Sequence, residues 1–170
     1  MIDEKVNVAC CFFRRQLVEE GSALIRISGW CMHPILKEGE KVRIVSKSIS
    51  SLKKGDVVAI CKNDRFYIHR IIKKTKNGLP VTKGDYSCLH DSIVGKDEYI
   101  GYWGRSLFGG FVATVSNIQS FFYLKYEKSN NEAFGGMFRS LIRLNMKINS
   151  LSLRLQRIFD YKVNHYYPKK

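Results

Sequence analysis

Three side-chain types that together can hydrolyse a peptide bond occur in order along this chain: Cys31, His69, and an acid at Asp85 or Asp91. A thiolate attacks a carbonyl carbon, an imidazole moves the proton, and a carboxylate keeps the imidazole in the productive orientation. The three groups must meet in space, whatever their order in the chain. We therefore take Cys31 as a candidate nucleophile, His69 as its base and one of the two aspartates as the orienting acid.

The surroundings of Cys31 favour a reactive role over simple packing. Ser28-Gly29 precede it and Pro34 follows closely, so we predict a tight turn whose backbone N–H groups are free to bind an oxyanion. Taken singly, the other residues have plainer interpretations. A lone histidine in a strand is usually packed, and an aspartate after glycine usually forms a turn. Only the combination supports a hydrolytic site.

The elements that must position these residues are predicted to be mainly β-strands. Between residues 41 and 101 apolar residues alternate or run continuously, and Asn77-Gly78 is typical of a hairpin turn. A short helix is predicted within residues 12–27, weakened or ended at Gly21. The sequence thus predicts an α+β protein with a mainly β core, a short N-terminal helix and a helical C-terminal extension.

The C-terminal part has a different pattern. Residues 107–126 are aromatic-rich and ambiguous, and residues 127–136 are predicted to be a polar loop. A helix follows, because apolar residues recur at alternating intervals of four and three. This a/d stripe consists of Met137, Leu141, Leu144, Ile148, Leu151, Leu155 and Ile158. Facing away from the stripe we expect Asn145, Asn149, Ser152 and Gln156. We divide the chain into an N-terminal segment (1–21), a core (22–106) and a basic extension (107–170).

The chain is strongly basic, with 29 Lys and Arg against 15 Asp and Glu, for a net charge of +14. Residues 125–170 hold ten basic and three acidic residues, so they carry half of the excess. A basic surface favours acidic partners. For the helix within residues 137–159 four uses stay open: packing on the body, a partner helix or homodimer, an anionic membrane surface, and nucleic acid. Nucleic acid is disfavoured, because no recognition motif is visible.

The five cysteines are an odd number without a Cys-x-x-Cys pair or zinc-like spacing. We therefore expect free thiols in a reducing cytosol, no metal and no cofactor, with Cys61 as a packed apolar side chain. The start of the chain shows no secretory signal, and no stretch of about 20 apolar residues could form a spanning helix. The predicted location is cytoplasmic, or peripheral at a membrane.

Four short motifs, in register over about residues 22–105, resemble the signal peptidase I superfamily, which includes the LexA-type self-cleaving repressors. The matching residues are Ser28, Gly29, Met32 and Pro34 around the nucleophile position, Gly55-Asp56, His69-Arg70, and Thr82-Lys83-Gly84-Asp85. Asp91 and the Ile100-Gly101 step follow at family-like distances. The resemblance implies a β-rich peptidase fold.

Histidine before the arginine is similar to the archaeal, endoplasmic-reticulum and sporulation-type branch, whose triad is Ser-His-Asp. The resemblance therefore implies that His69 is the general base, that Asp91 orients it, and that Asp85 supports the site. Candidates for the oxyanion site are Ser28 and the N–H of Cys31. For oxyanion or substrate contacts the resemblance points to Ser28, Met32 and Arg70.

Two departures from the family pattern matter. Cysteine stands at the nucleophile position, which suits an active cysteine peptidase or a relative that has lost activity. The chain also lacks the family's N-terminal membrane anchor, and so looks like relatives associated with bacterial peptide modification. The expected function is cleavage of a precursor or leader peptide in peptide natural-product maturation. The alternative is an inactive protein that binds a peptide or protein partner. A LexA-like regulator is disfavoured, because about 25 residues before the core are too few for a DNA-binding domain.

Overall fold

The computed structural model describes residues 8–62, 65–105 and 108–166. Its elements, in chain order, are α1 (Val8–Glu20), β1 (Ser22–Arg26), β2 (Lys41–Val45), a short 3-10 turn (Ile49–Ser51), β3 (Asp56–Lys62), β4 (Arg65–Lys74), β5 (Pro80–Lys83), β6 (Tyr99–Arg105), α2 (Gly109–Ser129) and α3 (Glu132–Tyr166). The α+β prediction is confirmed. The N-terminal helix ends at Glu20, next to Gly21 with its positive φ of 69°.

The six strands form one antiparallel sheet in the order β1-β2-β6-β3-β4-β5. β3 is central and apolar throughout its first part, and its residues from Val57 to Ile60 are buried on both faces of the sheet. β1 and β2 instead alternate between buried and exposed residues, as strands with one solvated face do. β1 is an edge strand, so one side of its backbone is not paired within the sheet.

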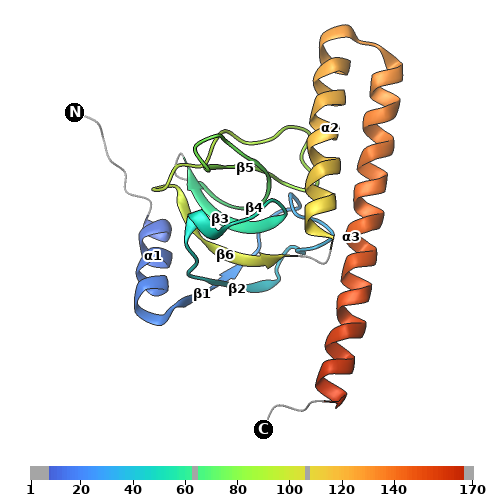
Figure 1. Cartoon of the computed structure of the whole chain (residues 1–170). Helices are drawn as coiled ribbons and strands as arrows, with labels where there is room; N and C mark the ends of the chain where they lie inside the picture. Colours follow the sequence, from blue (N-terminus) through green and yellow to red (C-terminus); the bar gives the residue numbers. More distant parts are fainter. Residues whose placement is uncertain (1–7, 63–64, 106–107, 167–170) are drawn as a thin grey trace, which may run out of the picture.

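The helices lie at opposite ends of the sheet, as Figure 1 shows: α1 on one side, and a long hairpin of α2 and α3 on the other. α1 buries Cys10 and Leu17 in the core beside β1 and β6. α2 packs on β4 and β5, where Ala113 meets Ile72 and Val81. Among the described residues, no helix combines the length and apolar character needed to cross a bilayer.

The expectation of five free thiols was wrong for two of them. Cys10 of α1 and Cys61 of β3 form a disulfide, whereas Cys11, Cys31 and Cys88 are free. Spacing gave no hint of this pair, because the two cysteines are 51 residues apart and meet only when α1 packs against the sheet. The disulfide therefore joins α1 to the central strand.

The polar loop predicted over residues 127–136 is mostly helical, and this prediction was wrong. Two residues are enough for the turn. Asn130 adopts the left-handed conformation (φ 49°) and ends α2, while the side chain of Asn131 accepts a hydrogen bond from the N–H of Ala133 at the start of α3. Asparagine tolerates both roles, since it visits the left-handed region and caps helix starts.

The sequence left open which face of α3 is covered by the rest of the protein. The polar residues Asn145, Asn149 and Ser152 are buried against the rest of the protein, whereas Met137, Leu144 and Leu151 of the apolar stripe are exposed. The polar residues turn inward because α3 packs against polar groups: Asn145 donates to Ser116 of α2, and Asn149 to Asp85. The position of the Gln156 side chain lies outside what the structure describes.

Candidate active site

Cys31 stands on a turn that follows β1. Gly29 adopts a positive φ of 87°, which favours glycine, and the chain then winds into a helical turn in which Leu36 N–H bonds the carbonyl of Met32 at 3.1 Å. Met32, only 2% exposed, anchors this turn in the core. Cys31, next to it, is half-buried and lines a cavity. The turn thus holds the thiol in a fixed position at the wall of the cavity.

His69 lies in β4, opposite Val58 of β3, and is 5% exposed. Its Nδ1 lies 2.6 Å from Oδ2 of Asp91, which comes from the segment after β5. The same Asp91 oxygen accepts a hydrogen bond from the hydroxyl of Thr82 at 2.7 Å, and the Asp91 N–H bonds the Thr82 carbonyl at 2.8 Å. The carboxylate is therefore held from two sides, and it fixes the orientation of the imidazole.

The thiol of Cys31 lines the same cavity as the imidazole and lies close enough to influence its pKa. Burial by itself lowers the pKa of His69, but the hydrogen bonds and charges of Asp91 and Cys31 outweigh burial and raise the pKa to about 9. At neutral pH the ring is then protonated, with Asp91 accepting from its Nδ1. Cys31, His69 and Asp91 meet in space, in the arrangement of a cysteine–histidine–aspartate triad.

A second turn, which follows β5, packs against the backbone of Cys31. The N–H of Tyr86 donates to the Cys31 carbonyl at 2.9 Å, and Ser87 of the same turn lines the cavity. Gly84 packs so closely that a Cβ there would lie 2.8 Å from the Cys31 carbonyl oxygen. Any side chain at position 84 would push the two turns apart. Glycine is needed at Gly84 for this close contact and not for an unusual φ.

Arg70 does not have the substrate contact predicted for it, and Asp85 does not orient His69 but lies behind the site. Both oxygens of the Asp85 carboxylate accept from Arg70, at 2.8 and 2.7 Å, and Asn149 of α3 donates to one of them at 3.1 Å. Arg70 is fully buried and also donates to the Gly55 carbonyl, so it cannot reach a substrate. A buried guanidinium needs a paired carboxylate, and Asp85 supplies it. Their contribution is to hold the strand and turn that carry the triad.

Lys83 of the same motif has a structural position as well. Its ammonium donates to the Ser116 carbonyl at 3.2 Å and to Oε1 of Gln119 at 2.8 Å, both on α2. Desolvation outweighs the nearby acids and lowers the pKa of Lys83 to about 8. This lysine therefore links β5 to α2.

A cavity of about 840 Å³ opens beside the triad. Ser28 lies at its exposed rim, and Met32 is on its wall with only 2% of its surface exposed; the substrate contacts predicted for the two residues stay predictions. The aromatic walls of the cavity were not predicted. They come from three elements: Phe13 of α1, Trp30 of the nucleophile turn, and Phe66 and Tyr67 of β4. Arg26 and Arg65 also line the cavity. The spacing of these residues carries no signal, because α1 reaches the cavity only through its packing on the sheet.

In the described ranges no group of three or more His, Cys, Asp and Glu side chains is arranged to hold a metal ion. Comparison with known proteins found no matching family model, no matching curated protein and no matching solved structure. The resemblance to the signal peptidase I superfamily therefore stays a prediction from four motifs.

Proposed function

We propose that this protein is a signal-peptidase-type endopeptidase that uses Cys31 to cleave a peptide bond in a precursor or leader peptide. The observation that carries the proposal is the contact chain from the Cys31 thiol through the His69 ring to the Asp91 carboxylate, beside a cavity. A buried imidazole with a strongly raised pKa is also expected more often at catalytic sites than elsewhere.

The chemistry follows from the protonation state of the pair. The Cys31 proton is already held on His69 as an imidazolium, which Asp91 stabilises, and the Cys31 thiolate of this ion pair attacks the substrate carbonyl. The oxyanion would be met by the N–H of Cys31 and by Ser28 at the rim. His69 then protonates the leaving amine as the C–N bond breaks. In the second half His69 takes a proton from water, which attacks the thioester; the C–S bond breaks, the acid leaves, and the thiolate–imidazolium pair is restored.

The cavity suits an extended, partly apolar peptide. β1 is a sheet edge, and its residues Ile25 and Arg26 border the cavity together with Ile27. A substrate strand could therefore add to β1 through backbone hydrogen bonds while its side chains enter the apolar space. Arg26 and Arg65 at the cavity favour acidic residues in the substrate. An acidic leader peptide fits this combination.

The alternative function, peptide binding without cleavage, is favoured by one observation. Sulfur is larger than oxygen, so a site shaped for serine can hold a cysteine slightly out of place. A misplacement of about 1 Å can cost roughly 100-fold in rate. On this alternative the cavity binds peptides and the triad is inert.

Cleavage can be tested by incubating the protein with a complex peptide mixture and identifying new termini by mass spectrometry. We expect wild type to generate them, Cys31→Ala to generate none, and Cys31→Ser to be slowed or inactive. Cys88→Ala is the matched control, because Cys88 is a free and exposed cysteine away from the cavity lining. New termini that persist in Cys31→Ala contradict the mechanism. Peptides retained by an inactive wild type support the alternative.

We also propose a cytoplasmic location, since a catalytic thiol must stay reduced. The Cys10–Cys61 disulfide is the observation against it, because disulfides are rare in the cytosol. Alkylation without reductant, followed by peptide mapping, is expected to label Cys11, Cys31 and Cys88 and to leave Cys10 and Cys61 unmodified. Labelling of Cys10 and Cys61 in protein taken directly from lysed cells would show that the pair is reduced there.

A further inference from the structure

The hairpin of α2 and α3 exposes large apolar side chains that recur at seven-residue spacing. On α2 these are Phe111 and Ile118, which are 56% and 41% exposed. On α3 they are Met137, Leu144 and Leu151, which are 49%, 43% and 51% exposed. We call these five residues the outer face. Exposed apolar residues repeated on one stripe of a helix usually mark a surface that something else covers.

The α3 part of the outer face lies on the side of the hairpin away from the sheet. Successive helical residues are rotated by about 100°, so Leu144 and Leu151 lie roughly 100–120° from Asn145, which faces α2. Asn149, which bonds Asp85 of the β-domain, is rotated about 40° in the opposite sense. The apolar stripe of α3 therefore points away from the sheet and the loops that carry the triad.

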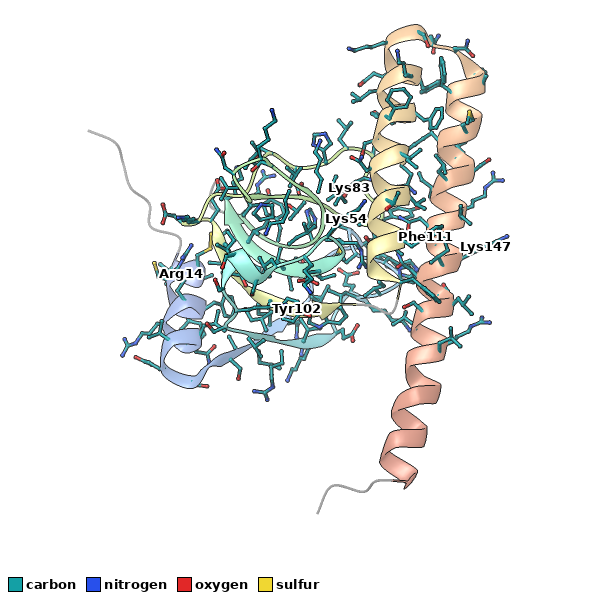
Figure 2. All side chains as sticks on the ribbon, in the orientation of Figure 1. Arg14, Lys54, Lys83, Tyr102, Phe111 and Lys147 are labelled. Atoms are coloured by element: carbon teal, nitrogen blue, oxygen red, sulfur yellow. A yellow bond between two sulfur atoms is a disulfide. The ribbon has the colours of Figure 1, made fainter. Side chains whose placement is uncertain are left out.

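The same helical geometry gives the directions in which the α2 residues of the outer face point. Ala113 packs against the sheet, and Phe111 and Ile118 lie about 140–160° around the helix from it. On α2, Gln119 faces α3 through its hydrogen bond to the Leu141 carbonyl. Phe111 and Ile118 thus share the flank on which the α3 stripe lies. Figure 2 shows Phe111 on the first turn of α2 and Lys147 projecting from α3 away from the sheet.

Positive charge surrounds the outer face. Arg143, Lys147 and Arg154 are exposed along α3 on the edge that lies away from α2, and Lys125 stands over the exposed ring of Phe121 on α2. Over residues 109–166 the chain has eight basic residues and only Glu127, Glu132 and Asp160 as acids. A second copy of this chain would bring the same positive edges together. The charge therefore disfavours self-association and favours a negatively charged partner.

We propose that the outer face docks on an anionic membrane surface, with its apolar side chains in the headgroup region and the basic edge on acidic lipids. A flat two-helix face with phenylalanine, leucine and methionine between basic residues has the composition of surface-binding helices, which lie in the plane of the interface. The hairpin would hold the peptidase site near the membrane without crossing it. This assignment does not depend on whether Cys31 is active.

The test is co-flotation of the full chain with lipid vesicles. We expect binding to vesicles of phosphatidylcholine mixed with phosphatidylglycerol, little binding to phosphatidylcholine alone, and weaker binding at high salt. The double variant Leu144→Ser/Leu151→Ser should bind the mixed vesicles roughly tenfold or more weakly, because two large apolar side chains no longer enter the bilayer. Val8→Ser/Val18→Ser is the matched control, since both valines are exposed on α1, outside the outer face.

Circular dichroism and alkylation of Cys31 verify that each variant is folded. Equal binding by Leu144→Ser/Leu151→Ser and wild type would overturn the assignment to the outer face. Absence of binding to the mixed vesicles would overturn the membrane assignment. Light scattering then tests whether a second copy of this chain covers the outer face. A dimer that forms in wild type and is absent in Leu144→Ser/Leu151→Ser would make the outer face a contact between copies.

Discussion

Replacing Asp91 with asparagine is expected to lower kcat/KM for peptide cleavage by roughly 10³–10⁴-fold, with the fold unchanged. Asparagine has almost the same shape, so the contact with Thr82 can persist, but it brings no negative charge to the His69 ring. The imidazolium then loses its main stabilising partner, and the amide can also stabilise the wrong tautomer. Rates on a defined peptide, chosen from the cleaved mixture, measure the effect.

The pH profile gives Asp91→Asn a second readout. In wild type the pKa of His69 is raised to about 9, so the imidazolium that protonates the leaving amine persists below about pH 9. Activity should therefore fall as the pH rises through about 9. Without the Asp91 charge the pKa of His69 drops, because burial is no longer outweighed, and this descending limb should move to lower pH.

The matched control for this pair of measurements is Asp97→Asn, an exposed aspartate that does not line the cavity. It should leave both the rate and the profile unchanged. If Asp91→Asn cleaves as fast as wild type, the contact between Asp91 and His69 is structural. Another group would then have to orient the imidazole, and the triad proposal would fail.

Two features could be predicted from the sequence, each for a different reason: the α+β class, and the meeting of Cys31, His69 and Asp91. Strand patterns are local, so the apolar run of β3 and the alternation of β2 are visible in the sequence. The triad is not local. It was accessible only because four motifs in register resembled a family whose fold brings such residues together. The positions are as predicted, whereas the catalytic roles stay predictions.

The features that could not be predicted depend on contacts between residues that are far apart in the sequence. An a/d stripe on a helix is normally covered, yet on α3 Met137, Leu144 and Leu151 of the stripe are exposed. The reversal occurs because Asp85 and Ser116 offer hydrogen bonds to Asn149 and Asn145, and neither bond is visible in the helix's own pattern. The disulfide between Cys10 and Cys61 likewise depends on how α1 docks. Local patterns indicate which face is apolar and not which face is covered.

Removal of the Asp85 carboxylate is expected to have the largest effect on stability. In Asp85→Ala the Arg70 guanidinium would remain fully buried and lose both of its bonds to the Asp85 carboxylate, and Asn149 would lose its bond to the same group. Breaking one side of a buried ion pair typically costs about 3–5 kcal/mol. Unfolding in urea measures the free energy. Glu19→Ala is the control: its ion pair with Arg15 is exposed, so we expect a change of about 1 kcal/mol or less.

The double replacement Arg70→Met/Asp85→Leu separates the charge from the shape. With both charges removed together, neither member of this pair is left buried without the other, so much of the lost stability should return. Cleavage should not recover to the same degree, because Asp85 lies between Gly84 and Tyr86, which pack against Cys31. If Asp85→Ala is as stable as wild type, Arg70 finds another counter-charge. If the double variant regains full activity, the ion pair does not position the nucleophile turn and serves the fold alone.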